Sequence, residues 1–208
     1  MYIPHFNVLE DQAEIRHMID AIGTAEIVTV GPDGTPLATL LPILWSEDGS
    51  TVIAHLARAN EHWKHIEPGS RCLAIVAGPQ AYVSPAWYAS KAEHGRVVPT
   101  WNYTAVHLTG TIIVHDDPEW VRRAVTELTE RHEHPRPSPW AVTDAPAKFV
   151  DGQLKAIVGL QMTVERVEAK AKLSQNRSVD DRKGVIAGLN TEGGPREMSV
   201  AMLMHQKP

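Results

Sequence analysis

Three strand-like stretches near the start of the chain are joined by turns that are too short to contain a helix. Residues 25–30 are followed by Gly31-Pro-Asp-Gly34, and residues 36–45 are followed by Asp48-Gly49 before a third stretch at 51–56. Turns of this kind connect antiparallel neighbours, whereas parallel strands need a crossover of a dozen or more residues. The pattern therefore predicts an antiparallel sheet or a small barrel, and it disfavours a doubly wound parallel sheet.

Helical patterns precede, interrupt and follow these strands. Residues 11–22 place apolar side chains at the spacing of one helix face, and Gly23 favours the end of that helix. The same signals predict helices that begin near Asn60, Pro118, Pro146 and Val179, with Asp116 or Asp117 as the cap of the second. Further strands are predicted at 71–77, 101–115 and 157–167. The proline-rich residues 135–140 predict a rigid extended connection.

The order of these elements indicates an α+β fold with helices at the periphery of the strands. A chain of 208 residues is long enough to bury a core in one domain. We expect a single domain over residues 1–208, with a helical excursion at about 117–150 and a C-terminal helical extension at about 170–208.

The overall charge argues against a surface built for nucleic acid. Lys and Arg number 20 against 25 Asp and Glu, for a formal net charge of -5. No apolar run approaches the length that crosses a bilayer, and the start of the chain lacks a basic segment followed by an apolar one, so we expect a cytoplasmic protein with no membrane partner. The single cysteine, Cys72, lies in an apolar run typical of a buried strand.

One segment has the residues of a phosphate site. Nucleotide-binding glycine motifs and the common hydrolase and metalloprotease motifs are absent from the sequence. Between His55 and Lys64, however, a strand ends and Asn60 can cap a short helix whose free amides lie between Arg58 and Lys64. The alternative is that both cations are solvated and Asn60 only caps the helix.

Histidine pairs suggest a metal site only weakly. His62 and His65 lie one helical turn apart, and His132 and His134 flank Glu133. A zinc site needs a third protein ligand that converges on the pair, and the sequence identifies none. We therefore predict no metal.

Aromatic residues gather in two blocks, 78–88 and 98–107, which together hold five of the twelve in the chain. Prolines beside them favour fixed planar side chains, which suit a flat cofactor, an aromatic interface between subunits, or simply a core. Downstream, residues 170–178 (KAKLSQNRS) combine cations with hydrogen-bonding side chains. This run predicts a polar loop that contacts a ligand or a partner subunit, with a solvated turn as the alternative.

Together these segments resemble one family. The start MYIP, the run from Ala57 to Asn60 with Trp63, both aromatic blocks, and KLSQNR at 172–177 closely resemble the PaiB-type FMN-binding negative transcriptional regulators. The resemblance runs nearly end to end. It implies an antiparallel split β-barrel of the FMN-binding type, assembled as a homodimer with FMN at the subunit junction, which represses genes tied to sporulation and degradative enzymes. DNA contact follows from the resemblance alone.

The resemblance also implies roles for particular residues. Arg58, Asn60 and Lys64, with His55, would hold the FMN phosphate, and the backbone of Thr39, Leu40 and Leu41 would face the edge of the ring. Residues that would close the site, some from the opposite subunit, are Trp101, Tyr103, Gln175 and Arg177. Two other functions stay open: a flavin-dependent oxidoreductase that uses NAD(P)H on a small acceptor, and a protein-binding module with a vestigial flavin pocket.

Overall fold

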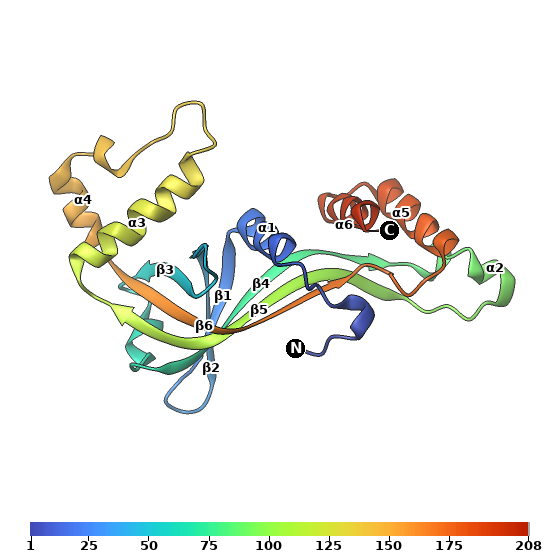
Figure 1. Cartoon of the computed structure of the whole chain (residues 1–208), viewed down its shortest axis with the longest axis horizontal. Coiled ribbons are helices and arrows are strands. Elements are labelled where there is room, and N and C mark those ends of the chain that lie inside the picture. The colour runs from blue at the N-terminus through green and yellow to red at the C-terminus, as the bar shows by residue number, and fades with distance from the viewer. Residues whose placement is uncertain (208) are drawn as a thin grey trace. The chain divides into compact units, whose positions relative to one another are not determined.

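The computed structural model describes residues 1–207, which form strands and helices in the order shown in Figure 1. The strands are β1 (Thr24–Val30), β2 (Pro36–Trp45), β3 (Thr51–Ala57), β4 (Ser70–Val83), β5 (Thr100–His115) and β6 (Ile157–Lys172). The α-helices are α1 (Gln12–Ile22), α2 (Ser90–His94), α3 (Pro118–Glu133), α4 (Ala147–Leu154), α5 (Val179–Glu192) and α6 (Pro195–Gln206). Short 3-10 helices are η1 (His5–Asn7), η2 (Glu61–His65), η3 (Pro85–Trp87) and η4 (Val142–Asp144).

The six strands close into a ring in the order β1-β2-β3-β6-β5-β4. β1 is antiparallel to β2 and β4, and β3 is antiparallel to β2 and β6. The two tight turns contain Gly34 and Gly49 at φ of 83° and 75°, a conformation that glycine adopts without steric cost. The predicted antiparallel sheet is confirmed.

The ladder between β2 and β3 is incomplete, and this positions the site described below. β2 pairs with β1 along Pro36–Pro42, but its ladder with β3 covers only Ile43–Trp45. The backbone edge of residues 36–42 that faces away from β1 therefore lies outside both ladders. Backbone amides and carbonyls on such an edge are open to a ligand or a partner.

The chain divides into two compact units, which we call the ring unit (residues 16–76 and 107–167) and the terminal unit (residues 1–15, 77–106 and 168–207). Strands β4, β5 and β6 each contribute residues to both units. These three are the longest strands, with 14, 16 and 16 residues.

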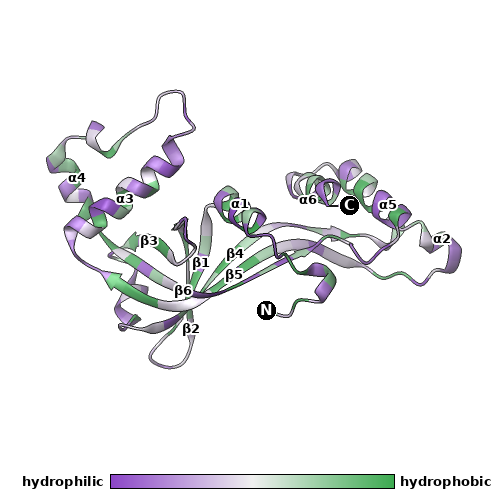
Figure 2. Ribbon diagram, viewed as in Figure 1, coloured by the Kyte–Doolittle hydropathy of each residue, from purple (hydrophilic) through white to green (hydrophobic). Residues whose placement is uncertain are grey.

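The ring unit buries one face of each strand. Val52, Ala54 and Leu56 alternate with less buried neighbours along β3, as expected for a half-buried strand. Beside the ring, Val121 of α3 packs in a small core with Val150 and Leu154 of α4. Figure 2 shows mostly hydrophilic residues along α3, in keeping with a helix that buries only one stripe.

The terminal unit builds its own core from strand ends and the last two helices. α5 and α6 lie side by side (Figure 1) and pack on apolar residues such as Val83 and Leu173. Asn102 and Ser174 are buried in this core and are hydrogen bonded to each other, which satisfies their polar groups. Ser174 has a φ of 62°, which allows β6 to turn toward α5.

Several elements differ from the sequence-based prediction. β4 continues into the first aromatic block as far as Val83, and β6 continues to Lys172, because both strands extend into the core of the terminal unit. Residues 135–138 of the proline-rich connection form turns and bends, so the prediction of an extended segment was wrong there. The apolar residues after Gly194 form a helix, α6, which Pro195 opens. Of the two predicted caps of α3, the structure confirms Asp117.

Candidate functional site

The end of β3 leads into a capped 3-10 helix. Asn60 has extended backbone angles, and its side-chain oxygen accepts a hydrogen bond of 3.1 Å from the amide of His62. Its amide group donates to the hydroxyl of Thr39 at 3.3 Å. Asn60 therefore caps η2, as predicted, and also ties η2 to β2.

His62 fixes η2 against the inner face of the ring. Its side chain is buried, and its Nε2 and Nδ1 atoms each lie 2.8 Å from a threonine hydroxyl, of Thr29 and Thr39 respectively. Burial, with a smaller contribution from the charge of His65, lowers the pKa of His62, so the ring is neutral near pH 7. Both ring nitrogens are engaged, and within residues 1–207 no group of three potential ligands is placed to bind a metal ion.

A pocket of about 230 Å³ lies beside this helix. Among its lining residues are Thr39, Asn60, His62 and His65. The structure thus brings together Thr39 and Asn60, which the sequence places 21 positions apart, next to the open edge of β2. The side chain of Leu40 is 60% exposed, whereas that of Leu41 is buried in the core. Of these two residues, only the backbone can serve the predicted site.

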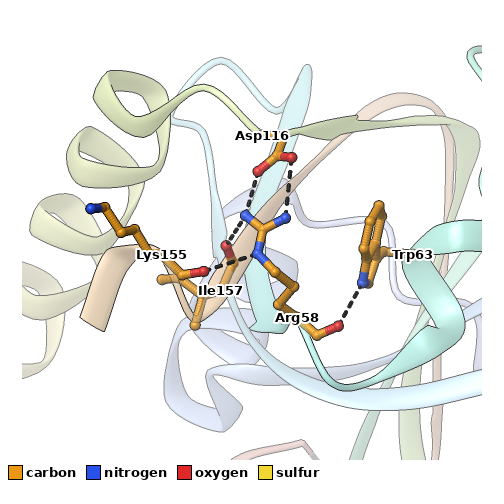
Figure 3. Close-up of polar contacts among 5 residues, drawn as sticks. All are labelled: Arg58, Trp63, Asp116, Lys155 and Ile157. Carbon is orange, nitrogen blue, oxygen red and sulfur yellow. Dashed lines mark hydrogen bonds and ion pairs between the residues drawn. The ribbon is translucent and has the colours of Figure 1, made fainter. Parts of the chain in front are cut away.

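Arg58 is directed into a different part of the ring unit (Figure 3). Its guanidinium forms an ion pair with Asp116 and donates to the backbone oxygens of Lys155 and Ile157 at 2.9 and 3.1 Å. The hydrogen bond and charge of Asp116 raise the pKa of Arg58, and the same pairing lowers the pKa of Asp116. Arg58 therefore ties the end of β3 to β5 and β6, and Trp63 donates to its backbone oxygen at 3.0 Å.

The other two predicted phosphate ligands are placed differently. Lys64 is half exposed and pairs with Glu61 at 2.7 Å, so its ammonium is at the surface beside η2. His55 lies opposite Gly159 in the β3–β6 ladder, and its Nδ1 atom is buried with no hydrogen-bond partner. Burial lowers the pKa of His55. An unpaired buried nitrogen is unusual and is available to a donor or acceptor that approaches this strand.

The remaining predicted residues lie together in the terminal unit. Trp101 is 49% exposed and meets Tyr82 edge to face, with ring centroids 6.2 Å apart. Gln175 bonds to the backbone of Leu173 and Ala171, which fixes the loop that follows β6. The guanidinium of Arg177 lies 4.8 Å from the ring centroid of Tyr88.

Two lysines of the 170–178 run contact Tyr103 but were given no individual role in the predicted site. Lys170 is 7% exposed, and its ammonium contacts the Tyr103 hydroxyl at 2.6 Å and the Tyr2 carbonyl at 3.1 Å. Lys172 donates to the carbonyl of Trp101, and burial is the main cause that lowers its pKa. Their spacing of two residues on a strand, which puts both on one face, was a usable signal in the sequence.

These residues fit a flavin mononucleotide by the chemistry of their groups. Asn60 and His65 line the pocket and offer donors to a phosphate, and the open edge of β2 offers backbone groups to a heteroaromatic ring. Lys64 lies on the same short helix outside the lining and offers a positive charge nearby. The unpaired Nδ1 of His55 is a further polar group without a partner in the chain. Arg58 fits this role only if its guanidinium leaves Asp116.

Comparison with known families and curated proteins identifies relatives along the whole chain. The family model described as "Putative FMN-binding domain" matches residues 1–166. The chain is 33% identical over 209 residues to "Protease synthase and sporulation protein PAI 2" of Bacillus subtilis, covering 100% of this chain and 98% of that protein. It is 34% identical over 158 residues to an uncharacterized protein of Aspergillus fumigatus, covering 68% of this chain and 60% of that protein.

Solved structures share the fold at low sequence identity. The FAD and heme binding protein from Mycobacterium smegmatis has a TM-score of 0.61 at 17% identity, covering 90% of this chain and 80% of that chain. A conserved hypothetical protein from Mycobacterium tuberculosis has a TM-score of 0.55 at 15% identity, covering 86% and 97%. Together with the strand ring, this likeness confirms the predicted fold class, an antiparallel split barrel with peripheral helices.

Proposed function

The chain belongs to the family of FMN-binding domains that includes the PaiB-type proteins, and we propose that it binds FMN as a homodimer and acts as a negative transcriptional regulator. The family match supports a flavin ligand. The regulatory role rests on similarity to a relative named for protease synthesis and sporulation. The observation that carries the proposal is the pocket beside Asn60, which adjoins the open backbone edge of β2.

In this proposal the ligand contacts come from η2 and β2. Asn60, His65 and Lys64 hold the phosphate, and the backbone of Thr39–Leu41 faces the ring edge. His62 lines the same pocket and holds Thr39 in place through a hydrogen bond of 2.8 Å. FMN, when bound, supplies one- and two-electron redox chemistry, and the chain supplies position and polarity around it.

Arg58 enters the phosphate site only by exchanging partners. A phosphate dianion carries more charge than the Asp116 carboxylate, so it can compete for the guanidinium. Removing the charge in Asp116→Asn tests this directly. If Arg58 is a phosphate ligand, the variant binds FMN more tightly than the wild type; unchanged affinity assigns Arg58 to holding the strand ends.

In the proposed homodimer, exposed aromatic side chains of the terminal unit lie at the subunit interface. Tyr2 is 84% exposed, and Trp101 and Tyr82 are exposed by 49% and 44%. Large aromatic side chains of this kind are enriched where subunits meet. We propose that Trp101 and Tyr103, with Gln175 fixing the adjacent loop and Arg177 beside it, close the flavin site of the opposite subunit. Analytical ultracentrifugation that finds only monomers would contradict this part.

A titration of FMN into matched lysine variants tests the phosphate contact. Lys64→Met should weaken FMN binding about tenfold, the effect of losing one hydrogen bond to a charged group. Lys148→Met, an exposed lysine on α4 outside the pocket, should bind FMN as the wild type does. Equal affinity in both variants would remove Lys64 from the site.

Measurements of NAD(P)H oxidation and of DNA binding distinguish the regulatory function from the oxidoreductase alternative. With FMN bound, a regulator should show no sustained oxidation of NADH or NADPH across a panel of small acceptors, and it should shift a promoter fragment in an electrophoretic assay. Steady turnover without a DNA shift would favour the oxidoreductase instead.

A further inference from the structure

A second cavity, of about 440 Å³, lies in the ring unit between α3, α4 and the adjoining strand ends. It has no lining residue in common with the pocket beside Asn60. Its volume falls in the range of sites that hold small molecules. Of its lining residues, the function proposed above involves only Arg58 and its partner Asp116.

The floor of this cavity is apolar and firmly packed. Val121 and Leu154 are 2% and 7% exposed and belong to the core between α3 and α4, and Ile157 packs against the same core. Side chains held by such a core keep their positions when a ligand arrives. The floor is therefore suited to the hydrocarbon part of a ligand.

The rim of the cavity carries one more positive charge than negative charges. Arg58 pairs with Asp116, and Arg122 pairs with Asp151 at 2.5 Å, so these four groups neutralise one another. The fifth charged group is Lys155, whose ammonium forms no ion pair within residues 1–207. Figure 3 shows the Lys155 side chain directed away from the Arg58–Asp116 pair, so the ammonium does not compete with Arg58 for the Asp116 carboxylate.

We propose that this cavity binds a small amphipathic monocarboxylate. The carboxylate pairs with the ammonium of Lys155, and the hydrocarbon body lies on Val121, Leu154 and Ile157. A single negative charge balances the rim without breaking either existing ion pair. A ligand amine would add a second unpaired positive charge to the rim, and an uncharged ligand would gain no ion pair with Lys155.

Calorimetric titration of the purified chain with straight-chain carboxylates tests the proposal. Each methylene buried on the floor should strengthen binding about fourfold, so octanoate, with two more methylenes, should bind about fifteenfold more tightly than hexanoate. Acetate, which lacks the body, should give no measurable heat of binding. Octylamine and octan-1-ol, which lack the carboxylate, should bind at least tenfold more weakly than octanoate.

A lysine variant checks the position of the carboxylate. Lys155→Met should weaken octanoate about tenfold, whereas Lys148→Met, another exposed lysine of the same segment, should not change it. With Arg58 paired to Asp116, FMN affinity should be the same in the presence and absence of octanoate, which separates this site from the flavin site. Equal octanoate affinity in the wild type and Lys155→Met, tighter binding of octylamine, or release of FMN by octanoate would each overturn the proposal.

Discussion

Replacing His62 by alanine should destabilise the fold by about 2–4 kcal/mol. The change removes two hydrogen bonds of 2.8 Å, to Thr29 and Thr39. Loss of the bond to the less buried Thr39 costs about 1 kcal/mol, and leaving the hydroxyl of Thr29 unpaired costs about 1–3 kcal/mol. Thr29 is only 2% exposed, so water does not replace its partner readily.

Urea denaturation followed by circular dichroism measures this loss. His65→Ala is the matched control, because His65 is an exposed residue of the same helix and its loss should change stability by less than about 0.5 kcal/mol. Adding Thr29→Val to His62→Ala should recover about 1 kcal/mol, since valine has nearly the same shape and no hydroxyl to satisfy. The reasoning is refuted if His62→Ala costs under about 0.5 kcal/mol, or if the second change makes the protein less stable still.

Three further outcomes follow from the same structure. Burial lowers the pKa of His55 and of His62, so just below about pH 6.5 the unfolded chain takes up these protons and the folded chain does not. The unfolding free energy should therefore fall with decreasing pH, by up to about 1.4 kcal/mol per pH unit for each histidine. His62→Ala should show a shallower pH dependence in urea titrations. Gly188→Ala in α5 places a methyl 2.3 Å from the Trp87 ring and should cost about 1–3 kcal/mol, whereas Gly152→Ala in α4 meets no neighbour within 4 Å and should be neutral or stabilising. Burial raises the pKa of Cys72 to about 12, so iodoacetamide should label this thiol only after unfolding; rapid labelling of the native protein, read by mass spectrometry, would contradict its burial.

Local sequence signals were sufficient for most of the ring. The glycine turns at 34 and 49 and the alternation along β1 and β3 are properties of neighbouring residues, and so is the capping of η2 by Asn60. Helix α3 was predictable for the same reason, because Asp117 and Pro118 mark its start.

What could not be predicted depends on residues far apart in the chain. Asp116 lies 58 positions from Arg58, and no local pattern indicates that these two side chains form an ion pair. The extension of β4 and β6 depends on α5 and α6, which cover their ends in the terminal unit.

The interior position of His62 likewise follows from its two threonine partners on β1 and β2. A histidine within a charged run is more often exposed, so sequence alone could not have assigned it to the core.

The candidate site was predicted in part. Thr39 and Asn60 line one pocket, but the side chain of Arg58 turns to another, and Lys64 pairs with Glu61 at the surface. Spacing along a strand and a helix start indicates which residues come close, whereas the direction of a long cationic side chain depends on which carboxylate is nearest.

Flavin titration monitored by fluorescence, with FMN and riboflavin side by side, tests the central claim most directly. If the pocket beside Asn60 holds a phosphate, FMN should bind and riboflavin, which lacks that group, should bind at least tenfold more weakly, with the difference shrinking as salt is raised. Equal binding of the two flavins, or binding of neither, would contradict the account.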